Sequence, residues 1–482
     1  MNLSALAERA GIELEGPGDA PVTGFAIDHR KVAPGTVFGA FRGTRVNGEE
    51  FIPAAVASGA VAVVARPEAH VAGAVHIPDP EPRRAFARLA AVFFAPVPDR
   101  VVAVTGTNGK TSTVEMTRQL WRMAGLRAAS IGTLGVTTPD ESVSTGLTTP
   151  DIVTFLANLA GLAREGVTHV AFEASSHGLD QYRNEGVRVA AGAFTNLSRD
   201  HLDYHADMND YFRAKMRLFD EVVAADGTAV MWADDAWSER ACDHARRRGL
   251  SLVTVGERGS GIRLLARVPG LLGQTLELEH EGVRRSVTLP LIGAYQAANA
   301  LVAAALVLAT GGEPGQTFDA LARLQPVRGR LERAAIARSG APVYVDYAHT
   351  PDALAAAIAA LRPHGQGRLF VVFGAGGDRD QGKRAEMGRV AGEAADVVIV
   401  TDDNPRGEDP AAIRRMVLAG ASGAREIGDR RAAIAAAVAE AGRDDIVLVA
   451  GKGHEQGQIV GAGEALRILP FDDVTVVREC IG

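Results

Sequence analysis

The sequence has very few cysteines: only Cys242 and Cys480 occur among 482 residues. Two cysteines so far apart predict no disulfide framework, which is typical of proteins in a reducing cytoplasm. The chain also lacks an excess of positive charge, since its formal net charge is -7. This charge balance argues against nucleic acid or an anionic membrane as a binding partner.

A long apolar run is missing at the start of the chain, where MNLSALAERAGIELEG mixes charges with short apolar steps. Such a segment is neither a signal peptide nor a membrane span. Hydrophobic residues make up 47% of the chain and charged residues 23%, which is the balance of an ordinary soluble globular protein. We therefore expect a cytoplasmic protein.

The chain is too long for one hydrophobic core, so several domains are expected. Apolar runs rich in β-branched residues alternate with Ala-rich helical stretches, which predicts α/β domains with mainly parallel sheets. Prolines interrupt this pattern near residue 94, and QPVRGR interrupts it again near residue 325. We predict a small N-terminal domain over residues 1–94, a central domain over 95–325 and a C-terminal domain over 326–482.

Residues 101–113, VVAVTGTNGKTST, contain an apolar strand, a Gly-rich turn and the start of a helix. Backbone N–H groups of such a turn, together with the helix N-terminus, form a cradle for phosphate oxygens. Lys110 would neutralise the terminal phosphates of a nucleotide, and the Thr111 hydroxyl would hold magnesium. The general motif GxxxxGK[ST] is not met, because Val104 replaces its first glycine. A plain turn is the alternative, but GTNGKT directly after a strand favours nucleotide binding.

One lysine interrupts an apolar helix face in residues 207–222. Lys215 shares a stripe at helical spacing with six apolar residues: Met208, Tyr211, Phe212, Leu218, Phe219 and Val222. Burial would lower the pKa of this lysine, because it disfavours the charged form. The ammonium of a lone lysine usually reaches solvent on its long stem. Alternatively, a neutral amine reacts with carbon dioxide to give a carbamate, whose oxygens suit magnesium.

The last third of the sequence contains four apolar strands, each followed by a polar loop. The loops read DYAHTPD, GAGGDRDQGKR, TDDNPRGEDP and GKGHEQG, and they carry Asp346, Arg379, Arg406 and Glu455. If the strands are parallel, the loops meet at one edge of the sheet, where open α/β folds bind ligands. GAGGDRD does not match the dinucleotide fingerprint GxGxxG, so a nicotinamide enzyme is poorly supported.

These motifs resemble those of the Mur ligases, and TGTNGKT also resembles the loop of the related folylpolyglutamate synthetases. The resemblance covers nearly the whole chain. It implies a three-domain α/β fold: an N-terminal UDP-binding domain, a central P-loop ATPase domain with a mainly parallel sheet, and a C-terminal Rossmann-like domain that binds an amino acid. It also implies a ligase that uses ATP and Mg²⁺ to form an acyl phosphate, which an amine then attacks.

DNPR at Asp403–Arg406 resembles the motif of the family branch that adds meso-2,6-diaminopimelate. The implied partners are UDP-N-acetylmuramoyl-L-alanyl-D-glutamate, meso-diaminopimelate and ATP, in peptidoglycan precursor synthesis. We expect a monomer with no nucleic-acid and no membrane partner. L-lysine or L-ornithine as the added amino acid remains an alternative, and so does a folylpolyglutamate-synthetase-like ligase. A nucleotide-gated binding protein that makes no product is a rival from another class.

The resemblance also implies a set of site residues. The ATP-binding set is Gly106, Thr107, Asn108, Gly109, Lys110, Thr111, Ser112, Asn299, Arg330 and Asp346. The set for the UDP-muramoyl peptide is Ile27, His29, Thr148, Thr149, Ser175, Gln181 and Arg183. The diaminopimelate set is Arg379, Asp403, Asn404, Pro405, Arg406, Gly451 and Glu455. The magnesium set is Thr111, Glu173, His201 and Lys215, and the resemblance implies that Lys215 is carbamylated by carbon dioxide; Lys110 and Lys215 are the catalytic pair.

Three positions depart from the family pattern. His29 replaces a usual serine, Asn47 replaces the aspartate of a usual DG pair, and Gln296 replaces a usual asparagine. The first two concern the detailed uridine contacts, and the third concerns one detail of the nucleotide site.

Overall fold

The computed structural model describes residues 1–14, 16–43, 46–138, 141–143, 148–202, 204–378 and 380–481. The chain divides into two compact units. Unit 1 comprises Met1–Gly261 and Val302–Thr317, and unit 2 comprises Ile262–Leu301 and Phe318–Gly482. The boundaries of the three predicted domains remain a prediction. Within the described ranges, no helix is both long and apolar enough to cross a membrane.

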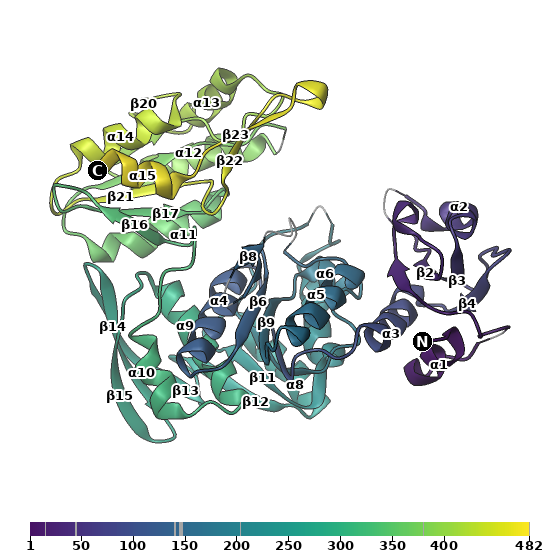
Figure 1. Ribbon diagram of the computed structural model, residues 1–482. Helices are drawn as coiled ribbons and strands as arrows, with labels where there is room; N and C mark the ends of the chain where they lie inside the picture. Colours follow the sequence, from purple (N-terminus) through teal and green to yellow (C-terminus); the bar gives the residue numbers. More distant parts are fainter. Residues whose placement is uncertain are drawn as a thin grey trace. The chain divides into compact units, whose positions relative to one another are not determined.

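Unit 1 begins with a parallel sheet in the order β1-β2-β3-β4 (Figure 1). Helices α1 and α3 share a core with one face of this sheet, and α2 packs on the other face. The elements are α1 (Leu3–Ala10), β1 (Gly24–Ala26), η1 (His29–Lys31), β2 (Thr36–Gly39), η2 (Gly48–Phe51), α2 (Ile52–Ala57), β3 (Ala60–Ala65), β4 (Val75–Pro78) and α3 (Pro82–Phe94).

The second sheet of unit 1 has the order β12-β11-β10-β5-β9-β6-β7-β8 and is parallel from β12 to β6. Its central strands are nearly all apolar because helices cover both faces. Because strands β12 to β6 run parallel, their carboxyl ends lie at the same edge of the sheet. The strands are β5 (Arg100–Thr105), β6 (Ala128–Gly132), β7 (Gly135–Thr137), β8 (Ser142–Val143), β9 (His169–Glu173), β10 (Val189–Phe194), β11 (Val223–Trp232) and β12 (Ser251–Gly256).

Helices α5, α7 and α8 share a core with one side of this sheet, and α4 packs against β5, β6 and β9 (Figure 1). The helices are α4 (Lys110–Met123), α5 (Ile152–Arg164), α6 (Ser176–Asp180), α7 (Met208–Arg217) and α8 (Ser238–Arg248). The apolar pattern of residues 207–222 extends beyond α7, which ends at Arg217 and continues as a π-helical turn, η3 (Leu218–Val222). Lys215 still lies within α7, and its side chain is buried, with 1% exposure.

Unit 2 contains the antiparallel run β15-β14-β13 and a sheet in the order β16-β17-β21-β18-β19-β20. The second sheet is parallel from β17 to β20. Its strands are buried on both faces: α11, α12 and α13 pack with Leu369, Val371 and Phe373, while α14 and α15 pack with Phe370 and Val372. The loops after β17, β18, β19 and β21 therefore leave the same edge, as predicted.

The strands of unit 2 are β13 (Ile262–Gly270), β14 (Gly273–His280), β15 (Val283–Leu289), β16 (Glu332–Ile336), β17 (Pro342–Asp346), β18 (Leu369–Phe373), β19 (Val397–Val400), β20 (Arg425–Glu426), β21 (Ile446–Ala450), β22 (Gly457–Val460) and β23 (Arg467–Pro470). Its helices and turns are α11 (Pro351–Leu361), η4 (Arg362–His364), α12 (Gly382–Ala394), α13 (Pro410–Leu418), α14 (Arg430–Glu440), η5 (Gly463–Ala465) and α15 (Asp473–Ile481). Helices α9 (Ala294–Ala309) and α10 (Pro314–Leu321) include residues of both units.

Candidate active site

The predicted phosphate loop leaves the carboxyl end of β5 and leads into α4. Gly106 has φ 149° and Gly109 has φ 86°, backbone conformations that favour glycine. A Cβ atom at Gly106 would lie 1.9 Å from the Oγ1 atom of Thr195. The loop therefore needs its glycines both for conformation and for close packing, and it brings its N–H groups to the start of a helix.

The segment after β10 holds the phosphate loop from the neighbouring strand. Asn196 accepts the N–H of Asn108 at 2.9 Å and donates to the Asn108 carbonyl at 3.1 Å. Thr195 donates to the same carbonyl at 2.6 Å. The Ser198 N–H donates to the Thr107 hydroxyl at 3.0 Å. None of these supporting residues was among the predicted site residues, although TNLS directly after a buried strand is a usable signal.

Two lysines meet at this loop. Lys110 Nζ donates to the carbonyls of Gly106 at 2.9 Å and Thr107 at 2.8 Å. Lys215 Nζ donates to the Gly106 carbonyl at 2.7 Å and lies 4.4 Å from the centre of the Tyr211 ring. Burial, and then the charge of Lys110, lower the pKa of Lys215 well below its usual value. The side chain of Lys215 therefore ends at the phosphate loop and does not reach solvent.

Oxygen ligands for a metal lie along the same sheet edge. Glu173 ends β9, next to β5, and its buried carboxylate accepts the N–H of Thr133 at 2.7 Å. A Cβ at Gly132 would lie 2.2 Å from this carboxylate, so the approach requires glycine. The Thr133 hydroxyl lies 3.1 Å from that of Thr148. Thr111 is buried in the first turn of α4. A carboxylate and a hydroxyl are ligands that fit Mg²⁺.

His201 fits magnesium less well, because Mg²⁺ prefers oxygen to nitrogen. Its side chain is partly exposed, and its ring lies 5.1 Å from that of His177 and 5.8 Å from that of Tyr211. In the described part of the chain, no three His, Cys, Asp or Glu side chains are grouped as metal ligands. Thr111, a modified Lys215, a substrate phosphate or water would supply further oxygens at this site.

The residues predicted to contact the muramoyl peptide form one hydrogen-bonded group around Thr149. Its hydroxyl donates to the Glu173 carbonyl at 2.9 Å and accepts the Ser175 N–H at 3.1 Å. Arg183 donates to the Thr149 carbonyl at 2.9 Å and to Gln181 Oε1 at 2.7 Å. A hydrogen bond from Thr149 to Glu173 therefore joins the predicted peptide residues to the predicted magnesium residues of unit 1.

His29 and Asn47, which depart from the family pattern, lie beside the N-terminal sheet and have local structural roles. His29 stacks on Phe51, with ring centres 4.4 Å apart and planes 2° from parallel. Asn47 caps η2 by accepting the N–H of Glu49 at 3.2 Å. Ile27, the other residue predicted here, follows β1 and is 37% exposed.

In unit 2, a partly buried polar contact joins the DNPR loop and the GKGHEQG loop. Asn404 Nδ2 donates to Glu455 Oε2 at 2.8 Å. Arg406 has φ 50° and donates to the Gly377 carbonyl at 2.9 Å. A Cβ at Gly377 would lie 1.9 Å from the Pro405 oxygen, so this loop is closely packed. Arg379 lies outside the described residues.

Gly451 and Asp403 belong to the same group. Gly451 has φ 116°, and a Cβ there would lie 2.9 Å from Asp403 Oδ2. The Gly451 N–H donates to the Asp346 carbonyl at 3.1 Å, which links the ends of β21 and β17. The structure therefore brings together the described members of the predicted diaminopimelate set.

The remaining ATP residues form a second buried group in unit 2. Burial raises the pKa of Asp346 to about 6, although Arg330 acts in the opposite direction. Asp346 Oδ2 accepts the N–H of Leu331 at 2.7 Å. Gln296 donates to the Arg330 carbonyl at 2.8 Å and accepts from Asn299 at 3.3 Å. The departing glutamine thus connects two predicted ATP residues.

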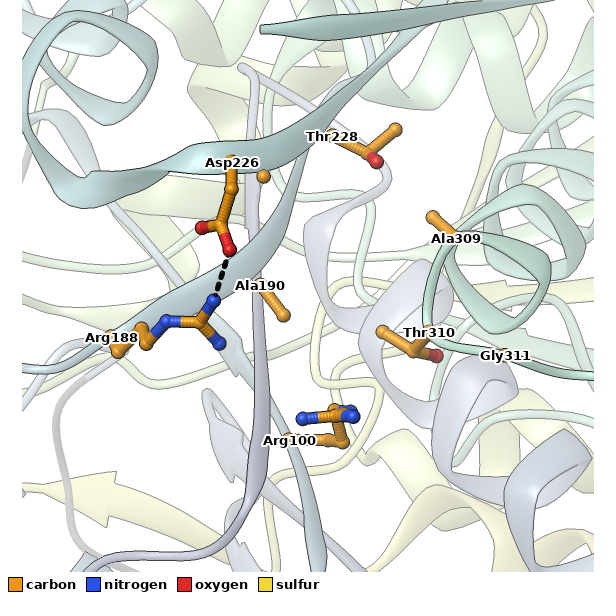
Figure 2. A pocket seen from close by; sticks show the side chains of 9 residues that line it. Arg100, Arg188, Ala190, Asp226, Thr228, Ala309, Thr310 and Gly311 are labelled. Atoms are coloured by element: carbon orange, nitrogen blue, oxygen red, sulfur yellow. Dashed lines mark hydrogen bonds and ion pairs between the residues drawn. The ribbon is translucent and has the colours of Figure 1, made fainter.

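An open pocket of about 300 Å³ lies in unit 1, and none of these residues lines it (Figure 2). It is lined by Arg100 at the start of β5, by the starts of β10 and β11, and by residues 309–311. Arg188 and Asp226 form an exposed ion pair of 2.5 Å on its wall. The phosphate loop leaves the opposite end of β5, so the predicted site residues lie at the loops and not at this pocket.

Three family models match the chain in order. They are the Mur ligase family catalytic domain over residues 21–94, the Mur ligase middle domain over 104–307 and the Mur ligase glutamate ligase domain over 329–453. A relative from Zymomonas mobilis subsp. mobilis is 61% identical over 463 residues, which cover 96% of this chain and 95% of the relative. The chain belongs to the Mur ligase family.

A second relative, from Bradyrhizobium diazoefficiens, is 53% identical over 464 residues, 95% of each chain. Both relatives are named UDP-N-acetylmuramoyl-L-alanyl-D-glutamate--2,6-diaminopimelate ligase. A solved structure of an enzyme with this name is 34% identical and has a TM-score of 0.75. The match covers 99% of this Mur ligase and 98% of the chain in that structure. The predicted family and fold class are confirmed. The role of each site residue in this Mur ligase stays a prediction.

Proposed function

We propose that this Mur ligase joins meso-2,6-diaminopimelate to the D-glutamate of UDP-N-acetylmuramoyl-L-alanyl-D-glutamate in an ATP-dependent reaction of peptidoglycan precursor synthesis. The observation that carries this proposal is the 61% identity, over 96% of the chain, to a relative named for that reaction. The junction of the DNPR and GKGHEQG loops supports it, because it presents an arginine, an amide and a carboxylate at one sheet edge. A cytoplasmic location is part of the proposal, since ATP is the co-substrate.

The chemistry proceeds in two steps. The D-glutamate side-chain carboxylate attacks the γ-phosphorus of ATP, which forms an acyl phosphate and releases ADP. An amine of diaminopimelate then attacks the acyl carbon, loses a proton and expels phosphate, which leaves an amide. Lys110, at the start of α4, stabilises the charge on the transferred phosphoryl group. Thr111 and Glu173 would hold Mg²⁺, which supplies a further positive charge beside the phosphates.

Carbamylation of Lys215 is also proposed. The neutral amine nitrogen bonds to the carbon of carbon dioxide and releases one proton, which gives an anionic carbamate with two oxygens. The support is the burial of Lys215, the lowered pKa of its amine and its hydrogen bond to the phosphate loop. A carbamate would replace a neutral amine beside Lys110 with an anion that suits magnesium. The proposal leaves His201 as the least suitable member of the magnesium set.

The ends of the other substrates are assigned by charge. We propose that Arg406 and Asn404 receive a carboxylate of diaminopimelate and that Glu455 receives an ammonium. The group around Thr149 is proposed for the muramoyl peptide, and His29 with Ile27 for the UDP end. Gln296 is proposed to keep Asn299 and Arg330 in place for ATP.

A phosphate-release assay tests the function. Phosphate should appear only when ATP, the UDP-muramoyl dipeptide and meso-diaminopimelate are all present, with one amide formed per phosphate. Phosphate release without the dipeptide would support a nucleotide-gated binding protein. Product formation with folate and glutamate in place of the muramoyl substrate would support the folylpolyglutamate-synthetase-like alternative.

A further inference from the structure

A fully buried lysine lies between the two loops proposed to bind the amino acid. Lys452 follows Gly451 and has 0% exposure. Its Nζ atom donates to Asn404 Oδ1 at 2.8 Å and to Asp403 Oδ1 at 3.3 Å, and it lies 3.7 Å from Glu455 Oε2. Lysines are rarely fully buried, and a buried ammonium requires partners that replace its water. All three partners of Lys452 are members of the predicted diaminopimelate set.

Lys452 fixes which end of the Asn404 amide faces the site. Asn404 Oδ1 accepts from Lys452 Nζ and also from the Ile459 N–H at 2.9 Å. With two donors on the oxygen, the Nδ2 group faces Glu455 Oε2 at 2.8 Å. The reversed amide would place its own donor against the ammonium and the N–H. Lys452 and the Ile459 N–H therefore together hold the orientation that presents an N–H donor to the site, and Lys452 supplies the charged one of these two donors.

Lys452 also separates the roles of two neighbouring carboxylates. Asp403 is 8% exposed at its side chain and lies closer to the ammonium, whereas Glu455 is 33% exposed. The charge of Lys452 thus offsets Asp403, and the more exposed Glu455 remains open to a ligand. Glu455 Oε2 already accepts from Asn404, which leaves its Oε1 atom for a substrate ammonium.

We infer that Lys452 is a positioning residue for the incoming amino acid. The inference rests on the proposed function of Asn404 and Glu455. Lys452 does not itself touch the amino acid; it holds the Asn404 amide for the substrate carboxylate and the Glu455 carboxylate for the substrate ammonium. Loss of Lys452 therefore weakens amino-acid binding specifically.

Steady-state kinetics of Lys452→Met tests this inference, because methionine keeps the stem but has no charge. The KM for meso-diaminopimelate should rise on the order of 10-fold or more. The KM values for ATP and for the UDP-muramoyl dipeptide should stay unchanged. Lys452→Arg should recover part of the loss, because it restores buried donors. Leu448→Ala, in the buried core of β21, is the matched control: it should lower Tm without changing the KM for the amino acid.

An unchanged KM for the amino acid in Lys452→Met, with a lower Tm, would overturn the inference and leave only a structural role. If Lys452→Met does not fold, Lys452→Gln replaces it, because its shorter, uncharged side chain cannot offset the charges of Asp403 and Glu455; a KM equal to wild type would then overturn the inference. If wild-type protein ligates a different amino acid, the diaminopimelate proposal fails by itself. The KM shift is then measured with that amino acid and decides the role of Lys452 separately.

Discussion

Lys215 and Lys110 donate hydrogen bonds to the same atom, the carbonyl oxygen of Gly106, at 2.7 Å and 2.9 Å. Two ammonium groups on one oxygen would repel each other strongly away from water. Burial and the charge of Lys110 both lower the pKa of Lys215, so the protein favours a neutral amine there. Conversion of that neutral amine to a carbamate would place a negative charge beside Lys110 and add an attraction between the two side chains. The shared hydrogen-bond acceptor thus couples the charge of Lys215 to the phosphate loop and to Lys110.

Lys215→Ala should be inactive in ligation, because it removes the proposed carbamate oxygens from the magnesium site. Short carboxylates such as formate or acetate should partly restore turnover by occupying the vacated oxygen positions. A carbamate signal in ¹³C NMR spectra of wild-type protein in ¹³C-bicarbonate, absent from Lys215→Ala, should accompany the activity. A crystal structure that contains an unmodified Lys215 amine beside bound magnesium would contradict the carbamate.

Lys110→Ala should retain the fold and lose ligation, because Lys110 is placed against the phosphate loop and not in the core. Loss of one contact to the transition state lowers kcat by about 10²–10³-fold. Turnover and Tm should be measured together. Arg122→Ala, at the exposed end of the same helix α4, should keep wild-type turnover. Near-normal kcat in Lys110→Ala would remove the loop lysine from the mechanism.

Asp346→Asn should stabilise the protein more at pH 8 than at pH 5. Burial raises the pKa of Asp346 to about 6, above the unfolded value of about 3.9. The folded state thus binds the proton of the Asp346 carboxyl more tightly than the unfolded state does. The stability that this proton contributes is lost as pH rises through the folded pKa of about 6. Linkage gives about 1 kcal/mol of additional gain for the variant between pH 5 and pH 8.

Urea unfolding at both pH values measures this difference between wild type and Asp346→Asn. Asp352→Asn is the matched control, because Asp352 is an exposed residue in the first turn of α11. Its effect on stability should be the same at pH 5 and pH 8. Equal effects of Asp346→Asn at the two pH values would mean that the Asp346 carboxyl titrates normally in the folded protein.

The sequence predicted those parts of the site that depend on strand direction. Apolar strands followed by polar loops indicated a parallel sheet, and the loops after β17, β18, β19 and β21 do share an edge. Periodicity also placed Lys215 in the middle of an apolar stripe, but it left open whether the amine reaches solvent, and only the resemblance to the family favoured the buried amine that the structure contains. Periodicity and strand order are local properties that a sequence expresses directly.

Contacts between distant segments could not be predicted in this way. Asn196 supports Asn108 across 88 residues, and Lys452 reaches Asn404 across 48, in both cases through side-chain geometry that no periodicity encodes. The end of α7 at Arg217 was also not predictable, since the apolar pattern continues unchanged through the π-helical turn. The stacking of His29 on Phe51 gives a departure from the family pattern a structural partner that only the fold identifies.

The choice of the added amino acid depends on Arg406. Meso-diaminopimelate has a carboxylate and an ammonium at its far end, whereas lysine and ornithine end in an ammonium alone. Arg406 is held in the DNPR loop by its bond to the Gly377 carbonyl, and the Asn404–Glu455 pair belongs to the same loop junction. Lysine would leave this partly buried arginine without its carboxylate, at a cost of about 1–3 kcal/mol.

We therefore expect meso-diaminopimelate to exceed lysine and ornithine in kcat/KM by roughly five-fold to over a hundred-fold. Arg406→Lys should reduce this discrimination, because an ammonium cannot hold a carboxylate through two parallel bonds. The three amino acids should be compared with both proteins at saturating ATP and UDP-muramoyl dipeptide. Better turnover of lysine or ornithine by wild-type protein would show that the DNPR interpretation is wrong. The family assignment would stand, because it rests on the whole chain and not on this loop.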